Sequence, residues 1–110
     1  MEKTVLCAGT YVVDIITGKL DKAVTPQSGF HTTVSSNPGG NALNVAVDLV
    51  NLTVPGSSIT CCGAVGNDFE GQFLKSTLSG KGIIDFTKVI DDQGTSKSII
   101  LSFGDESRAF

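Results

Sequence analysis

The sequence predicts an α/β fold built on parallel strands, and three consecutive segments carry this prediction. Residues 4–8 are a β-branched and apolar run that ends at Gly9, which is typical of a buried strand. Residues 41–52 have helical periodicity, and residues 58–62 form a second short apolar run. A helix that crosses over between two strands places them parallel, so we expect a βαβ unit and an α/β sandwich.

The glycine turn before the helix is the first candidate binding element. Gly39 and Gly40 follow a proline, can take positive φ and leave room for a ligand that approaches closely. The first turn of the helix has free N–H groups at the positive end of its dipole and points at whatever lies above these glycines. We expect the helix to be buried on most sides, because its polar residues form a single narrow stripe. These residues are Asn41, Asn44, Asp48 and Asn51.

Asn41 and Asn44 allow two interpretations. Asn44 lies near enough to the turn to add a side-chain donor and acceptor for a ligand. Alternatively, Asn41 only caps the helix and Asn44 is a polar residue on its solvent side.

Four segments, in the same order, resemble the ribokinase or PfkB family of carbohydrate kinases. They are Gly9 to Asp14, Gly39 to Ala46, Cys62 to Asp68 with Gly71, and Gly104 to Arg108. The resemblance spans nearly the whole chain and implies a ribokinase-like three-layer α/β/α sandwich with a small β-sheet lid. Thr53 departs from the family pattern, which usually has glycine or serine there, and this affects only the local turn.

The resemblance also implies a domain organisation. Residues 1–110 correspond to the N-terminal part of a ribokinase-like domain, and segments of about 17–36 and 97–110 correspond to the lid. Family members are much longer, and their C-terminal ATP-binding half carries the anion hole and the catalytic aspartate. That half is absent from this sequence, so we expect an N-terminal fragment with no catalytic residue of its own.

Asp14 is the second candidate binding element, because it is a carboxylate within the apolar segment 11–16. Burying an ionised aspartate without partners is costly, so Asp14 either faces solvent at a strand end or edge turn, or receives a ligand with hydroxyl donors. A carboxylate accepts two hydrogen bonds side by side, which matches a vicinal diol. In the family that the sequence resembles, this position binds the substrate.

The resemblance implies a set of substrate-binding residues. Asp14 and Asn44 would hydrogen-bond the substrate hydroxyls, Gly39 and Gly40 would let the backbone approach, and Asn41 would frame the turn.

Arg108 and His31 are weaker candidates. Arg108 would reach a substrate anion or hydroxyl from the lid edge, but a solvated surface arginine is the alternative. His31 lies on the outward face of an alternating strand over residues 30–36, and no acid or nucleophile near it in sequence supports a general-base role.

The remaining elements follow from periodicity and capping signals. Asp68 is expected to cap a helix over residues 69–78, which Gly80 and Gly82 end. Its apolar stripe is expected to comprise Phe69, Phe73, Leu74, Thr77 and Leu78. Gly63, Gly66 and Gly71 are expected to punctuate the turn at the start of this helix. Two more strands are expected at residues 83–89 and 98–103.

Composition excludes several classes of function. The chain has 110 residues, 40% apolar and 17% charged, which is typical of a globular domain, and a net charge of −3 without a basic patch predicts no nucleic-acid partner. The cysteines are odd in number, and Cys61 and Cys62 are neighbours in an apolar strand, which suits small buried side chains better than a disulfide framework. Without a CxxC spacing and with one histidine, a zinc site would lack ligands. The first residues are neither a signal peptide nor a membrane span, so we expect a cytoplasmic protein.

The function predicted from the sequence is the substrate-binding N-terminal portion of an ATP-dependent sugar or nucleoside kinase. The resemblance implies ATP and Mg²⁺ as cofactors, with binding residues mostly outside this chain, and we expect the chain alone to be inactive. A lid of few strands cannot bury both faces, which predicts a homodimer through the lid. The alternatives are a non-catalytic sugar-binding and dimerisation module, or a nucleotide-binding half of another α/β protein. The latter is weakened because the chain has neither a P-loop nor a GxGxxG motif.

Overall fold

The computed structural model describes residues 4–20, 29, 32–52, 57–104 and 107–109. In chain order the elements are β1 (Thr4–Ala8), β2 (Val12–Thr17), β3 (Val34–Gly39), α1 (Asn41–Leu52), β4 (Ser58–Gly66), α2 (Phe69–Gly80), β5 (Ile84–Ile90), β6 (Lys97–Ser102) and β7 (Arg108–Ala109). They fall into two compact units. The first comprises Met1–Val13 and Pro38–Ser96, and the second Asp14–Asn37 and Lys97–Phe110. No helix in the described part of the chain is long and apolar enough to cross a membrane.

The first unit contains a three-stranded sheet of order β1-β4-β5, in which both pairs of neighbours are parallel. The predicted βαβ unit of β1, α1 and β4 is therefore confirmed. Strand β4 continues to Gly66, although we expected it to end at residue 62 and Gly63 to lie in a turn. A Cβ at Gly63 would overlap the ring of Tyr11, so this glycine makes room within the strand for a packed aromatic side chain.

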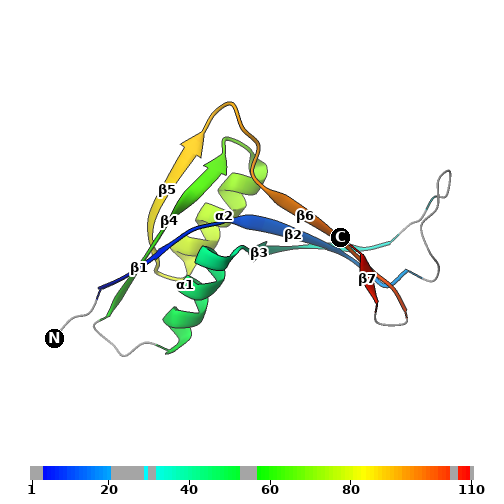
Figure 1. Cartoon of the computed structure of the whole chain (residues 1–110), viewed down its shortest axis with the longest axis horizontal. Coiled ribbons are helices and arrows are strands. Elements are labelled where there is room, and N and C mark those ends of the chain that lie inside the picture. The colour runs from blue at the N-terminus through cyan, green and yellow to red at the C-terminus, as the bar shows by residue number, and fades with distance from the viewer. Residues whose placement is uncertain (1–3, 21–28, 30–31, 53–56, 105–106, 110) are drawn as a thin grey trace. The chain divides into compact units, whose positions relative to one another are not determined.

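Both helices of the first unit pack against the same face of this sheet (Figure 1). The register places Cys61 of β4 beside Asp85 of β5. The Sγ of Cys61 donates to the carbonyl oxygen of Ala42 in α1 at 3.7 Å, and the Oδ2 of Asp85 lies 3.6 Å from the Nζ of Lys75 in α2. The neighbouring residues Cys61 and Asp85 thus contact α1 and α2, respectively.

The opposite face of the three-stranded sheet exposes large apolar side chains. Leu6, Ile84 and Phe86 are 63%, 45% and 66% exposed. Leu6 and Ile84 flank Thr60 in register, so they point to the same side. In the described chain, the three-layer architecture is therefore represented by one helix layer and the sheet.

Helix α1 is less buried than predicted. Its buried residues are Ala42, Leu43 and Ala46, whereas Val45 and Leu52 are 49% and 78% exposed. The expectation of burial on most sides is wrong, because among the described helices and strands the main contacts of α1 are with β1 and β4 on one side.

Helix α2 begins where the sequence predicted. The Oδ1 of Asp68 accepts a hydrogen bond from the backbone N–H of Gly71 at 2.8 Å, which confirms the predicted cap. Leu74 and Leu78 are fully buried, but Phe69, which we placed in the buried stripe, is 88% exposed. Phe69 is the first residue of the helix.

Strand β3 differs from its prediction. It begins at Val34 and includes Pro38 and Gly39, which we expected in the turn. Thr32 and Thr33 lie outside the strand, and His31 lies outside the described residues.

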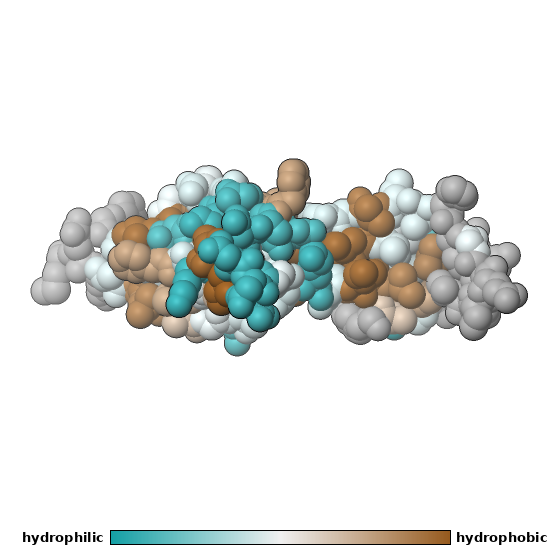
Figure 2. All heavy atoms as spheres, turned by 90° about the horizontal axis from the view of Figure 1, so that it is seen from above, coloured by the Kyte–Doolittle hydropathy of each residue, from teal (hydrophilic) through white to brown (hydrophobic). Residues whose placement is uncertain are grey.

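The four-stranded sheet has the order β3-β2-β6-β7 and lies largely in the second unit, where β6 and β7 pair antiparallel. The buried apolar side chains among the described residues of this unit are Leu20 and Ile100. Val34 and Ile99 are 64% and 57% exposed, and apolar atoms gather over this sheet in the right half of Figure 2. Large apolar side chains of this sheet are therefore exposed.

Candidate functional site

The corner between β3 and α1 is built around the side chain of Asn41. Its Oδ1 accepts hydrogen bonds from the backbone N–H and the Oγ1 of Thr10, at 3.0 and 2.9 Å. Thr10 lies in the loop between β1 and β2. Asn41 is the first residue of α1, and its side-chain oxygen ties the helix to this loop instead of accepting from the helix N–H groups.

Gly40 is required by the backbone of this corner. Its φ is +91°, and a Cβ there would overlap the carbonyl group of Thr10 and approach the Cα of Tyr11. The space that the missing side chain leaves is thus occupied by the β1–β2 loop. Gly39 is buried at the end of β3.

Asn44 combines an anchored backbone with an exposed side chain. Its backbone N–H donates to the carbonyl oxygen of Gly40 at 2.9 Å, which is the first hydrogen bond of the α1 ladder. The N–H groups before it have no partner within the helix and lie at the positive end of the dipole. The side-chain amide makes no hydrogen bond with any described residue. The first turn of α1 therefore offers donors and one acceptor to a ligand.

Asp14 and Arg108 belong to the second unit. Asp14 lies on β2, is half-buried, and its carboxylate forms no hydrogen bond or ion pair with the part of the chain that the structure describes. Arg108 lies on β7 and is exposed beside a small pocket of about 100 Å³. The structure thus brings Gly39, Gly40, Asn41 and Asn44 together in the first unit, whereas the other two candidates lie in the second.

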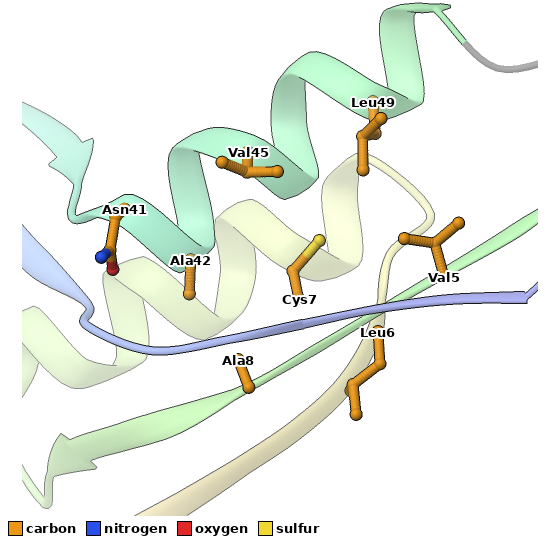
Figure 3. A pocket seen from close by; sticks show the side chains of 8 residues that line it. All are labelled: Val5, Leu6, Cys7, Ala8, Asn41, Ala42, Val45 and Leu49. Atoms are coloured by element: carbon orange, nitrogen blue, oxygen red, sulfur yellow. The ribbon is translucent and has the colours of Figure 1, made fainter.

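A larger groove of about 340 Å³ lies between β1 and α1 (Figure 3). Val5 and Cys7 point from the strand toward the helix, from which Val45 points back. Its lining is Val5, Leu6, Cys7, Ala8, Asn41, Ala42, Val45 and Leu49. No motif in the sequence predicted this groove, although the alternation of buried and exposed residues along β1 is the signal for its apolar wall. With Asn41 as its one polar side chain, it has few groups that hydrogen-bond sugar hydroxyls.

Tyr11 and Cys61 form a buried polar pair without catalytic character. Tyr11 is 2% exposed, and its hydroxyl accepts a hydrogen bond from the Oγ1 of Thr87 at 3.0 Å. Burial, helped by the contact with Cys61, raises the pKa of the Tyr11 hydroxyl well above its ordinary value. Burial likewise raises the pKa of the Cys61 thiol, so neither group ionises at neutral pH. The described residues contain no cluster of three His, Cys, Asp or Glu side chains that could hold a metal ion.

Comparison with solved structures identifies the fold. Ribokinase from Giardia lamblia superposes with a TM-score of 0.88 at 19% identity, over 97% of this chain and 34% of that one. Fructokinase from Xylella fastidiosa gives 0.79 at 24% identity, over 100% and 32%. Ribokinase from Arabidopsis thaliana, solved with ribose and ATP, gives 0.83 at 18% identity, over 97% and 34%. The predicted ribokinase-like α/β fold is confirmed, and the chain spans about a third of the length of these structures.

Sequence comparison identifies the family. A search of curated proteins found no match. The model of the pfkB family carbohydrate kinases matches residues 2–110, which is nearly the whole chain. This chain therefore belongs to the pfkB family of carbohydrate kinases.

Proposed function

We propose that this chain is the substrate-binding N-terminal portion of an ATP-dependent kinase that phosphorylates a hydroxyl group of a sugar or nucleoside. Family membership and the ribokinase fold support this proposal, and the Arabidopsis ribokinase was solved with ribose and ATP. The family match argues against a nucleotide-binding half of an unrelated α/β protein. ATP and Mg²⁺ belong to the proposal, but no site for them is assigned to the described residues.

The half-buried carboxylate of Asp14 is the observation that carries the proposal. A partly buried carboxylate is stabilised by hydrogen-bond donors, and no described residue of this chain supplies one to Asp14. Two neighbouring hydroxyl groups of a sugar supply two donors in the geometry that a carboxylate accepts.

The beginning of α1 offers hydrogen-bonding groups within the first unit. The side-chain amide of Asn44 and the N–H groups of the first helical turn can donate to sugar oxygens. We assign Gly39, Gly40 and Asn41 to shaping this turn, because Gly40 and Asn41 are locked against Thr10. Residues locked before ligand binding lose little entropy when the ligand arrives.

The proposed contribution of this chain is binding and orientation. It would hold the acceptor hydroxyl group in a fixed position, and the proton and phosphoryl transfers would depend on groups that are not assigned in this chain. We therefore expect the isolated chain to bind its substrate without turning over ATP.

The lid and its dimer contact are a further part of the proposal. We assign residues of about 17–36 and 97–110 to a lid over the substrate and expect Arg108 at its edge to contact the ligand. The exposed Val34 and Ile99 on the four-stranded sheet support a homodimer through this region. We place the protein in the cytoplasm, where sugars and ATP are available.

Calorimetric titration with ribose, fructose, 2-keto-3-deoxygluconate and adenosine tests this proposal. We expect one of them to bind, and Asp14→Asn or Asn44→Ala to weaken its binding by about tenfold or more, because each removes one charged or directional hydrogen bond. Asp48→Asn is the matched control, because Asp48 is an exposed acid on α1. If none of the four compounds binds, the proposed role of the isolated chain is contradicted. It is also contradicted if a compound binds and neither Asp14→Asn nor Asn44→Ala weakens its binding.

A further inference from the structure

Asp68 does more than cap a helix, because its carboxylate also holds the segment between β5 and β6. Its Oδ1 accepts from the backbone N–H of Gly71 at 2.8 Å, and its Oδ2 accepts from the backbone N–H of Thr95 at 2.8 Å. The Oγ1 of Thr95 donates to Oδ1 at 2.5 Å. One carboxylate thus joins the start of α2 to the residue that lies two positions before β6.

Thr95 extends this connection to the end of β4. It is 5% exposed, and its Oγ1 accepts a hydrogen bond from the backbone N–H of Gly66 at 2.9 Å. The packing there leaves no room for a side chain, since a Cβ at Gly66 would overlap the backbone at Gln93 and Thr95. The hydroxyl of Thr95 is therefore both donor and acceptor in a tightly packed corner.

The next residue links this corner to β2. The carbonyl oxygen of Ser96 accepts from the backbone N–H of Val13 at 2.9 Å. Val13 and Ser96 are the residues at which the chain leaves the first unit, and Asp14 follows Val13 directly. Every bond from Asp68 to Val13 lies within the first unit.

We propose that Asp68 is a positioning residue for the sugar site, which through Thr95 and Ser96 fixes the backbone from which Asp14 extends. This inference rests on the proposed function, in which Asp14 binds the sugar. Charge-assisted hydrogen bonds to a carboxylate are stronger than neutral ones, and Thr95 is nearly inaccessible to water that would compete for them. The hydrogen bond between Val13 and Ser96 joins the second residue of β2 to the residue directly before β6.

The test compares variants of the anchor with a variant that weakens the same unit elsewhere. Asp68→Asn replaces one acceptor oxygen by a donor, and Thr95→Val removes the hydroxyl but keeps the Asp68–Gly71 cap. Thr95→Ser keeps the hydroxyl and is the conservative rescue. Lys75→Met removes the Lys75–Asp85 ion pair between α2 and β5 and is the control for lost stability.

Two quantities are measured for each variant: sugar affinity by calorimetry, and the hydrogen-exchange rate of the Val13 amide by NMR relative to amides of β4. We expect Thr95→Val and Asp68→Asn to weaken sugar binding and to speed Val13 exchange, each by about tenfold. Thr95→Ser should stay close to the original protein in both, and Lys75→Met should lower the unfolding midpoint without changing affinity. If Asp68→Asn does not fold, the comparison of Thr95→Val with Thr95→Ser decides.

Different results separate this inference from the proposed function. If the original chain binds none of the four compounds, the proposed function fails, and unchanged Val13 exchange in Thr95→Val would then overturn the anchor as well. Suppose instead that sugar binds, and that Lys75→Met and Thr95→Val lower the stability equally. If both variants then lose the same sugar affinity, Asp68 is only a structural residue.

Discussion

The two units of this chain differ in how much of their surface they can bury alone. In the first unit, Leu43, Leu74 and Leu78 are completely buried between one sheet face and two helices. In the second unit, the buried apolar side chains among the described residues are Leu20 and Ile100, which is little for a four-stranded sheet. We therefore expect the first unit to carry most of the stability of the chain.

Truncating one core side chain in each unit should separate their stabilities. We expect Leu74→Ala to lower the free energy of unfolding by about 2–5 kcal/mol, because it opens a cavity in a fully packed site. Ile100→Ala should cost less and leave the main transition in place. Urea denaturation followed by circular dichroism measures both, with Phe69→Ala as an exposed control. Equal losses in one shared transition would show that the units unfold together.

Two glycines of the first unit should respond in opposite directions to the same change. Gly40→Ala forces a Cβ into the Thr10 backbone at a positive φ, and we expect a loss of about 1–3 kcal/mol together with the loss of sugar binding. Gly80 lies at the end of α2, where a Cβ would meet nothing within 4 Å, so Gly80→Ala should be neutral or stabilise by up to about 1 kcal/mol. Similar unfolding midpoints for the two variants would contradict the packing at Gly40.

The sequence predicted what depends on local periodicity and capping. The first strand, the crossover helix and the Asp68 cap were predicted from residues within a few positions of one another, and the structure confirms them. Gly63 is different, because the residue that requires a glycine there is Tyr11, whose ring would overlap a Cβ at this position. Tyr11 lies 52 positions away in sequence, so local patterns predict only a turn at Gly63.

The same limit applies to the candidate site. The interlock of Asn41 with Thr10 and the anchor from Asp68 to Thr95 join residues from separate elements. A single sequence identifies such residues as polar or small but does not show which partner satisfies them.

Alkaline titration probes the core of the first unit. Tyr11 is the one tyrosine in the sequence and there is no tryptophan, so phenolate absorbance reports on this side chain alone. Its folded pKa lies above the ordinary value of 10.0, so the stabilisation is fully present below pH 10 and is lost as the pH rises further. One pH unit above the ordinary value of 10.0, we expect the free energy of unfolding to be lower by about 1.4 kcal/mol. The buried Cys61 thiol contributes in the same direction from pH 9.0 upward.

Tyr11→Phe is the control for this titration. It removes the hydrogen bond with Thr87, which costs about 1 kcal/mol at neutral pH, but it should make alkaline unfolding less steep. Phenolate formation at the same pH in the native and the urea-unfolded chain would contradict the burial of Tyr11.

The smallest expected effect is a change in average mass when an exposed apolar residue of the three-stranded sheet is replaced. The open face of the three-stranded sheet is about 15 Å wide at a strand spacing of about 4.8 Å, so it offers much less than the roughly 800 Å² per partner of a stable interface. We therefore expect Phe86→Gln to change the average mass in light scattering only slightly. Ile99→Gln on the four-stranded sheet should shift the chain toward monomer, since Ile99 is exposed in the unit that has fewer buried apolar side chains among its described residues. If Phe86→Gln shifts the mass more than Ile99→Gln does, the contact lies on the three-stranded sheet. Dimerisation would then not explain the exposed apolar side chains of the second unit.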